Sequence, residues 1–192
     1  MDKFKLSDLN TKKIFNTSIN NLKLQRYNLN NVTFEKSKIE NCDLSESHFI
    51  KSKFENTVLN NLTILHGDLS CVIFKHSIFE MYDCRDTNYK QCSFDNNTFK
   101  FCNFRGCDFS DGNLIKNNFN NTDLKSSEFH NSIIKNTNFN NCDLYMAKFM
   151  GAYLSNVTFK NCNLFFTDFT NFNFDKLYIN DKEIFNINDI NK

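Results

Sequence analysis

The chain has 192 residues, with 23 lysines and arginines against 22 aspartates and glutamates, so its net charge at pH 7 is only +1. This length predicts a single domain over residues 1–192. No apolar segment is long enough for a signal peptide or a membrane span, so we expect a cytoplasmic protein. Proline is absent and glycine occurs four times, which fits a continuous ladder without large loop insertions.

A large apolar residue recurs at every fifth position from Phe4 to Ile184 without a change of phase. These 37 centres are 17 Phe, 11 Leu and 7 Ile, together with Cys84 and Tyr89. The residue two places before the centre is small in 26 of the 37 repeats. Two inward residues separated by an outward one form a strand-like alternation, but the next inward pair comes only after a turn. The pattern therefore predicts a solenoid that turns once in five residues and buries one large and one small side chain per turn.

The second residue after each centre is expected to form the corner. It is Asn in 15 of the 37 repeats, and Asn tolerates left-handed backbone conformations and bonds its own backbone. Stacked Asn side chains also form ladders. The composition of this position is thus typical of a corner that is repeated along the whole chain.

Several repeats consist of a small residue, then Asp, then Leu or Phe. The clear cases are Cys42-Asp43-Leu44, Cys107-Asp108-Phe109, Thr122-Asp123-Leu124, Cys142-Asp143-Leu144 and Thr167-Asp168-Phe169. With these repeats, residues 2–186 resemble the pentapeptide-repeat family, although Ser, Thr or Cys replaces the alanine of the family pattern Ala(Asp/Asn)(Leu/Phe)XX. The resemblance implies an all-β fold, a right-handed four-sided parallel β-helix of twenty residues per coil and about nine coils.

In chain order, residues 1–20 keep the apolar phase, but Asp2 and Lys12 occupy small positions, so we expect a first coil or cap there. Tyr82 is large where a small residue is expected, and Cys84 is small where a large one is expected, so their volumes should compensate. Sorted by twenty, the centres fall into four columns, one for each side of the coil. We name these sides basic (Phe34, Phe54, Phe74, Phe94), asparagine (Phe79, Phe99, Phe119, Phe139, Phe159), acidic (Phe109, Phe129, Phe149, Phe169) and leucine (Leu24, Leu44, Leu124, Leu144, Leu164).

Outward positions become apolar near the C-terminus, where residues 172–192 are expected to form a cap. Two interpretations stay open for these side chains. They belong to a simple cap, or they form a homodimer contact at the C-terminal end, which the family resemblance implies. The residues concerned are Tyr145, Met146, Phe165, Phe166, Phe172 and Tyr178.

Residues with the potential for chemistry are spread over the chain. Of the eight cysteines, six lie at small inward positions and one is a centre, so we interpret them as core residues with free thiols, while Cys71 should face outward. His66, Cys71 and His76 lie five residues apart and thus on three different sides, so they cannot bind one metal ion. No catalytic or phosphate-binding motif is found. We therefore expect no metal, no cofactor and no enzymatic activity.

Charge differs between the sides. The acidic side has seven acidic and three basic residues, the basic side has nine basic and four acidic residues, and the asparagine side is nearly uncharged. These are either ordinary solvated surfaces or a partner-binding acidic stripe flanked by a basic one. The candidate binding residues of the stripe are Asp8, Asp68, Asp108, Asp111, Glu128 and Asp168.

Two functions stay open. Family members of similar size imply a non-enzymatic protein that binds a type II DNA topoisomerase, DNA gyrase or topoisomerase IV. Such a protein protects the enzyme against quinolones or, as an immunity protein, against a peptide toxin. It does so as a DNA mimic, with carboxylates in place of phosphates, although such a mimic should be strongly acidic. The alternative is a rigid scaffold or adaptor with an unknown protein partner. Neither function involves direct binding to nucleic acid or to a membrane.

Overall fold

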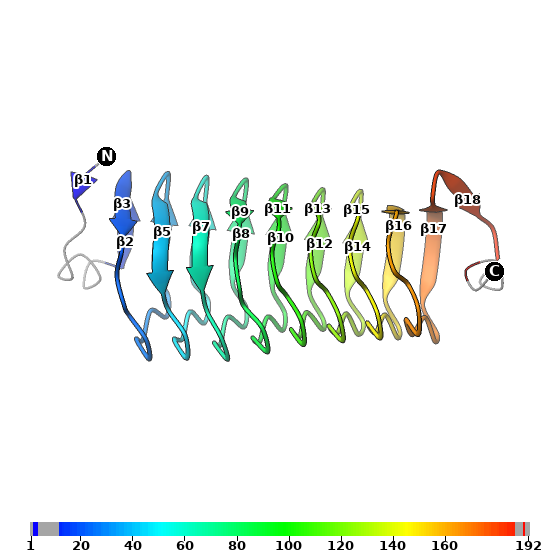
Figure 1. The fold of residues 1–192 in the computed structure, drawn as a ribbon, viewed down its shortest axis with the longest axis horizontal. Coiled ribbons are helices and arrows are strands. Elements are labelled where there is room, and N and C mark those ends of the chain that lie inside the picture. Colours follow the sequence, from blue (N-terminus) through cyan, green and yellow to red (C-terminus); the bar gives the residue numbers. More distant parts are fainter. Residues whose placement is uncertain (1, 4–11, 187–189, 191–192) are drawn as a thin grey trace.

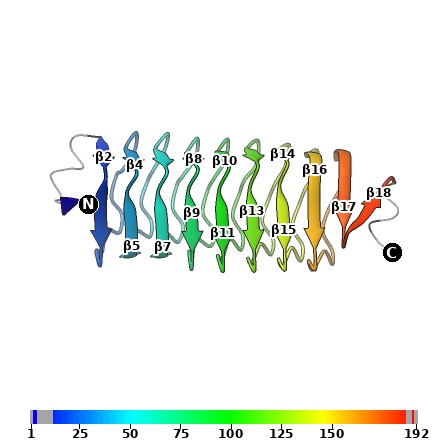
Figure 2. The ribbon, with the colours of Figure 1, turned by 90° about the horizontal axis from the view of Figure 1, so that it is seen from above.

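The computed structural model describes residues 2–3, 12–186 and 190. These residues form a straight rod of stacked coils, which Figure 1 shows from the side and Figure 2 from above. Paired strand residues of successive coils lie 20 positions apart, as Phe99 does from Phe119 and Phe119 from Phe139, and the strands are parallel. The predicted all-β solenoid is confirmed. Residues 12–186 make about eight coils, close to the nine predicted for the whole chain.

Two of the four sides carry regular strands. Those of the basic side are β2 (Lys13–Phe15), β4 (Thr33–Glu35), β6 (Lys53–Glu55), β8 (Ile73–Lys75), β10 (Ser93–Asp95), β12 (Asn113–Ile115) and β14 (Ile133–Lys135). Those of the asparagine side are β3 (Thr17–Asn20), β5 (Lys38–Asp43), β7 (Val58–Thr63), β9 (Ile78–Glu80), β11 (Thr98–Lys100), β13 (Asn118–Asn120) and β15 (Asn138–Asn140). Two longer strands, β16 (Tyr153–Lys160) and β17 (Asn173–Ile179), run along both sides. The ends carry β1 (Asp2–Lys3) and β18 (Lys182–Ile184).

The leucine and acidic sides are built differently: each has one bridge residue per coil, and a β-turn follows each of their centres. The amide three residues after a centre donates to the carbonyl of that centre, as the Cys107 N–H does to the Phe104 oxygen at 3.1 Å. The residue between them with a positive φ, here Gly106, occupies the third place of the turn. This arrangement fits a type II turn, which requires a positive φ at that place.

The corners have the predicted left-handed conformation. From Asn16 to Asp181 every fifth residue has a positive φ, between 49° and 70°, and only two of these residues are glycines. Left-handed backbone costs about 1–2 kcal/mol for an ordinary residue and is adopted far more readily by Asn. The ladders are also present: the Asn61 Nδ2 donates to Asn41 Oδ1, and the Asn156 Nδ2 to Asn136 Oδ1, both at 2.8 Å.

The interior contains the predicted columns of rings. Successive rings from Phe79 to Phe159 are stacked with centroids 4.3–5.0 Å apart. Rings of neighbouring columns meet edge-on, as Phe99 and Phe104 do at 78°. Each such pair adds about 0.5–1.5 kcal/mol to the gain from apolar burial. Tyr82 and Cys84 are both buried, at 1% and 0% exposure, so the predicted exchange of sizes is confirmed.

The small inward residues do more than fill space. The Val32 N–H donates to the Ser52 Oγ at 3.1 Å, and this hydroxyl donates to the Leu29 carbonyl at 2.6 Å. The Asn97 N–H likewise donates to the Asn117 Oδ1 at 3.0 Å. Because these side chains satisfy backbone groups of the preceding coil, Ser, Thr, Cys and Asn have a role here that alanine lacks.

The stacking of coils ends at β17, which pairs in parallel with β16 but antiparallel with β18. The chain therefore turns back on itself instead of beginning another coil, as the red end of Figure 1 shows. Phe172 stacks on Phe174 with centroids 5.3 Å apart, and Leu177 is fully buried. These oversized residues cover the last layer of the core. No helix occurs in the residues described, hence none that could cross a membrane.

Candidate functional site

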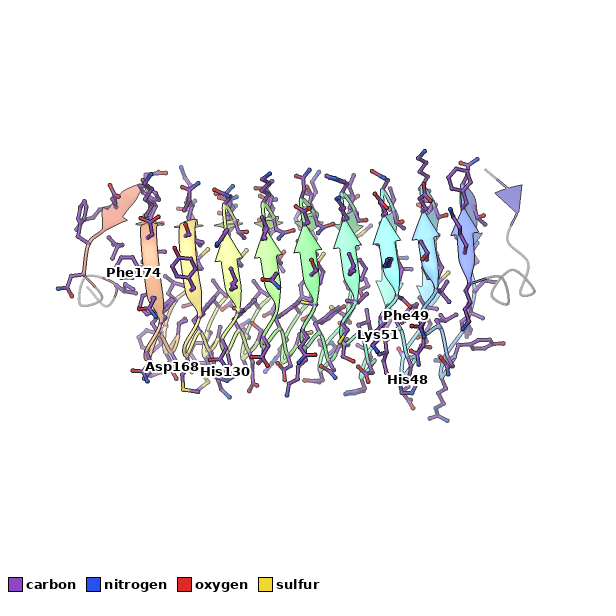
Figure 3. The ribbon with its side chains drawn as sticks, turned by 180° about the vertical axis from the view of Figure 1, so that it is seen from behind. His48, Phe49, Lys51, His130, Asp168 and Phe174 are labelled. Atoms are coloured by element: carbon purple, nitrogen blue, oxygen red, sulfur yellow. The ribbon has the colours of Figure 1, made fainter. Side chains whose placement is uncertain are left out.

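The acidic side presents one outward residue per coil in a single row along the rod. Parallel bridges join, in order, Asn28, His48, Asp68, Asn88, Asp108, Glu128, Lys148 and Asp168. Neighbours in this row are about 4.8 Å apart, the spacing of paired strands. In Figure 3, His48, His130 and Asp168 lie along one edge of the rod. Four of the predicted binding residues, Asp68, Asp108, Glu128 and Asp168, thus share this row.

The other two predicted binding residues lie elsewhere. Asp111 forms a left-handed corner between the acidic and basic sides, with a φ of 59°. Its Oδ1 accepts a hydrogen bond from the Asn131 Nδ2 at 3.4 Å. Asp8 lies outside the described residues.

The aspartates of the row also stabilise the backbone. The Oδ1 atoms of Asp68, Asp108 and Asp168 accept the N–H of the residue two places on, at 3.0, 2.9 and 2.8 Å. Asp43 and Asp123 do the same on the leucine side, at 3.0 and 2.9 Å. An Asx turn of this kind requires an Asp or Asn before the centre. The acidic residues of the repeat therefore have a structural reason to be there besides any contact with a partner.

Lysines neutralise part of the row. Lys90 Nζ lies 3.0 Å from Asp108 Oδ2, and Lys148 Nζ lies 2.7 Å from Glu128 Oε1. In the part of the chain that the structure describes, Asp68 and Asp168 have no ion pair within 4.0 Å. Asp68 also accepts a hydrogen bond from the Asn88 Nδ2 at 3.1 Å. Asp168 is the carboxylate without an ion pair at the C-terminal end of the row.

Two carboxylates of the row are held in the ionised form. Burial opposes ionisation of Asp108, but hydrogen bonds from Ser110 and Lys90 outweigh it and keep the pKa of Asp108 below its usual value. Hydrogen bonds from Thr170 lower the pKa of Asp168. Both groups are consequently negative at neutral pH.

Apolar side chains gather on the leucine side of the last coils. Phe165 and Phe166 are 63% and 64% exposed, and their ring centroids lie 4.3 Å apart. Tyr145 packs on both rings, at 6.3 and 5.8 Å, and Met146 is also exposed. The structure thus brings together four of the six residues predicted for a cap or dimer contact, and we call these four the aromatic cluster.

The remaining two residues of that prediction are separate from the aromatic cluster. Phe172 is buried in the end of the core at 8% exposure, and Tyr178 lies in β17 on the asparagine side. The prediction grouped these two residues with the cluster only because they are close to it in the sequence.

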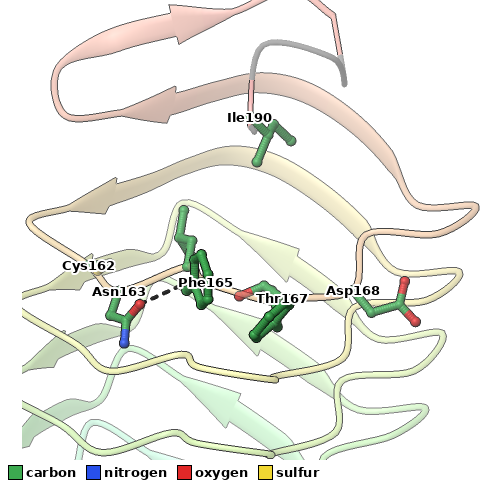
Figure 4. A pocket seen from close by; sticks show the side chains of 8 residues that line it. Cys162, Asn163, Phe165, Thr167, Asp168 and Ile190 are labelled. Atoms are coloured by element: carbon green, nitrogen blue, oxygen red, sulfur yellow. Dashed lines mark hydrogen bonds between the residues drawn. The ribbon is translucent and has the colours of Figure 1, made fainter. Parts of the chain in front are cut away.

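Two hollows adjoin the aromatic cluster. One, of about 730 Å³, lies at the open end of the last coil and is shown in Figure 4; its lining includes Leu164, Phe165 and Ile190. The other, of about 450 Å³, lies at the corner towards the acidic side and is lined in part by Met146 and Lys148. Phe166 and Asp168 border both hollows. Asp168, a carboxylate of the acidic row without an ion pair in the described structure, is therefore next to the exposed rings.

Sequence reasoning did not single out one exposed pair, Met81 and Phe101. Both are corner residues between the asparagine and leucine sides, with exposures of 51% and 60%. The signal was present in the sequence, because both occupy the corner position that Asn fills in 15 repeats.

The cysteines occupy the places that the sequence predicted. Six are buried, Cys71 and Cys162 are half-buried, and all eight are free thiols. Burial raises the pKa of the Cys102 thiol to about 12, which makes it unreactive at neutral pH. Among the described side chains, no three of the types His, Cys, Asp and Glu come together in a metal-binding arrangement.

Coils of twenty residues, a corner at every fifth residue and an interior of stacked Phe and Leu define a solenoid protein with a five-residue repeat. The family model for pentapeptide repeats matches this chain in eight copies, over residues 28–62, 83–111 and 113–145. The chain belongs to the pentapeptide-repeat family.

The solved structures that match this chain have low sequence identity to it. QnrB1, described as a plasmid-mediated fluoroquinolone resistance protein, is 16% identical, with 85% of this chain and 92% of that chain covered and a TM-score of 0.48. HetL from the cyanobacterium Nostoc sp. strain PCC 7120, involved in heterocyst differentiation regulation, is 11% identical, with coverages of 90% and 91% and a TM-score of 0.37. A pentapeptide repeat protein of the Arabidopsis thaliana thylakoid lumen is 19% identical, with coverages of 47% and 63% and a TM-score of 0.45. No curated protein matches the chain.

Proposed function

We propose that this protein is a non-enzymatic binding protein of the cytoplasm that uses the acidic side to contact a protein partner. The observation that carries the proposal is the single row of outward side chains on a straight, unbroken side, ending in the unpaired Asp168 next to the aromatic cluster. Flat sides with diverging side chains suit contact with a broad protein surface. Catalytic groups, in contrast, have to converge in a concave site.

The candidate partner is a type II DNA topoisomerase, DNA gyrase or topoisomerase IV, which the protein would protect against quinolones or a peptide toxin. A groove that binds duplex DNA is positively charged and attracts a row of carboxylates. Asp68, Asp108 and Asp168, held by their turns and parallel to the rod axis, form such a row.

A second candidate function, a scaffold or adaptor with another protein partner, is favoured by the charge density. Between Lys51 and Asp168 the acidic side carries five carboxylates and three lysines, a net charge of −2. This stretch is about 29 Å long at 4.8 Å per coil. Duplex DNA of that length carries about 17 negative charges. An electrostatic imitation of DNA would therefore have to rely on shape more than on charge.

The test is a supercoiling assay with purified gyrase, with and without ciprofloxacin, in which the protein is titrated. The decisive variant is Asp108→Asn combined with Asp168→Asn, because Asn keeps the Asx acceptor and removes only the charge. The matched control is Asp123→Asn combined with Asp143→Asn on the leucine side, which has the same turn.

If the topoisomerase is the partner, wild type and control will alter supercoiling or restore it in the presence of the drug, and the acidic-side variant will be weaker. If neither activity nor binding changes at about micromolar protein, the topoisomerase is excluded and the scaffold function stands.

We further propose that the aromatic cluster forms a homodimer contact at the C-terminal end. Four large apolar side chains that are exposed together are typical of an interface. Size-exclusion chromatography with light scattering should show a dimer for the wild type and a monomer for Phe165→Ser combined with Phe166→Asn. A wild-type monomer at high concentration would leave the cap as the role of these residues.

A further inference from the structure

The corner between the asparagine and leucine sides is a row of eight residues with one interruption. The row is Asn21, Asn41, Asn61, Met81, Phe101, Asn121, Asn141 and Asn161. All eight have a φ between 49° and 57°. Six are thus the residue that this backbone favours, and the two in the middle of the rod are large apolar residues.

Met81 and Phe101 are energetically unfavourable at this corner for two reasons. Their left-handed backbone disfavours bulky residues, and their side chains, 51% and 60% exposed, leave much apolar surface in water. They also interrupt the asparagine ladder, in which Asn61 bonds Asn41. No aromatic contact of the Phe101 ring exists within the described residues. Residues that break a local rule without a structural gain typically serve a function.

The side chains around Phe101 indicate which kind of partner would bind there. Ile78, 44% exposed, lies on the asparagine side of the coil of Met81, with Glu80 as the outward residue between them. Lys100, next to Phe101 on the asparagine side, and Arg105, four residues further on along the leucine side, are both exposed, and neither has a carboxylate within 4.0 Å among the residues placed by the structure. The two sides that meet at this corner thus each carry a cation without an ion pair.

The cations at the place of Arg105 in the preceding and following coils are already engaged. Arg85 makes two hydrogen bonds of 3.0 Å to Asp83, and Lys125 lies 2.9 Å from Asp143. Glu80 pairs with Lys100 in the strand register but forms no ion pair with it in the described structure. Lys100 and Arg105, on the two sides that meet at Phe101, are therefore available to a carboxylate of a partner.

We propose that Met81, Phe101 and Ile78 form a docking site for a segment of a partner protein that presents a large apolar side chain next to a carboxylate. Phe and Met are enriched in the cores of interfaces, and free cations beside them select acidic neighbours by charge complementarity. The site lies at the corner diagonally opposite the one between the acidic and basic sides. It is therefore independent of the proposed function of the acidic side.

The first experiment asks whether the apolar corner has a structural role. Met81→Asn and Phe101→Asn restore the residue of the other six corners, so the melting temperature of each variant should rise by about 1–4 °C. A lower melting temperature for Phe101→Asn would show that the ring stabilises the rod, and would overturn the proposal.

The second experiment measures binding by fluorescence anisotropy with three labelled peptides. They are Gly-Glu-Leu-Phe-Glu-Gly, its lysine analogue Gly-Lys-Leu-Phe-Lys-Gly, and Gly-Glu-Ser-Ser-Glu-Gly, which lacks the apolar pair. The matched control variant is Phe15→Asn, because Phe15 is also an exposed phenylalanine next to a cation, with Lys36 Nζ 5.5 Å from its ring centroid, and lies outside the acidic side and the aromatic cluster.

The first peptide should bind the wild type and Phe15→Asn alike, and Phe101→Asn at least about tenfold more weakly. The other two peptides should bind the wild type and Phe15→Asn more weakly than the first does. The proposal fails if the first peptide shows no saturable binding up to about 1 mM, or if Phe15→Asn loses as much affinity as Phe101→Asn. It also fails if light scattering shows a dimer that Phe101→Asn abolishes, because a second copy would then occupy the site.

Discussion

The hydroxyl oxygens of Tyr82 and Tyr89 lie 2.7 Å apart inside the rod, where both side chains are fully buried. Tyr82 occupies a small position, and Cys84, a small residue at a centre, leaves the space into which the tyrosine extends. Tyr82 and Tyr89, which depart from the repeat at two separate positions, thus form one buried polar pair.

This pair predicts a non-additive double-mutant cycle. Tyr82→Phe and Tyr89→Phe should each lower the free energy of unfolding by about 1–3 kcal/mol, because each leaves the other hydroxyl buried without its partner. The double variant should lose less than the sum of the two. Chemical denaturation of the four proteins measures the coupling, and strictly additive losses would contradict the hydrogen bond.

The exchanged sizes of Tyr82 and Cys84 predict that two destabilising substitutions at these positions compensate each other. Tyr82→Ser alone should destabilise the protein by about 3–5 kcal/mol through a cavity, and Cys84→Phe alone should destabilise it by about 1–3 kcal/mol through overpacking. Combined, the two changes restore the usual repeat and should recover most of the loss. A double variant that is less stable than either single variant in thermal unfolding would show that the volumes do not compensate.

At the small inward positions, replacing Ser by Ala and replacing Ala by Ser should have opposite effects on stability. Ser52→Ala removes the acceptor of the Val32 N–H and should cost about 1–3 kcal/mol. Ala152 occupies the same position five coils further on, and Ala152→Ser should be neutral or stabilising because it supplies a hydroxyl there. Urea titrations of both variants check the pair of predictions. Equal destabilisation by both would mean that size alone decides this position.

Lowering the pH should reduce the contribution of Asp108 and Asp168 to the stability of the fold. The pKa values of Asp108 and Asp168 are lowered by folding, so their contribution to stability is present above the ordinary pKa of about 3.9 and is lost as the pH falls through the lower folded values. Asp108→Asn combined with Asp168→Asn should therefore melt below the wild type at pH 6, and the difference should shrink towards pH 2. Melting curves across this range test the sign, and a difference independent of pH would refute it.

The sequence alone determined the repeat, the corners and the columns. A centre at every fifth residue and an Asn-rich corner act within one coil, where local sterics decide the backbone, so the left-handed corners could be predicted from the repeat. The stacking of Phe99, Phe119 and Phe139 could be predicted once the family resemblance implied twenty residues per coil. The compensating sizes of Tyr82 and Cys84 were also readable, because they concern volume in one interior.

Surface contacts and the arrangement of the ends were decided by the tertiary structure. Whether Lys148 neutralises Glu128 depends on the directions of two long side chains that are 20 residues apart. A cap over residues 172–192 was predicted, but no repeat position signals that the chain turns back as the antiparallel strand β18. A five-residue pattern specifies which residues point inward, but the energies of surface charges and of the last, unpaired layer depend on neighbours that only the stacked coils bring together.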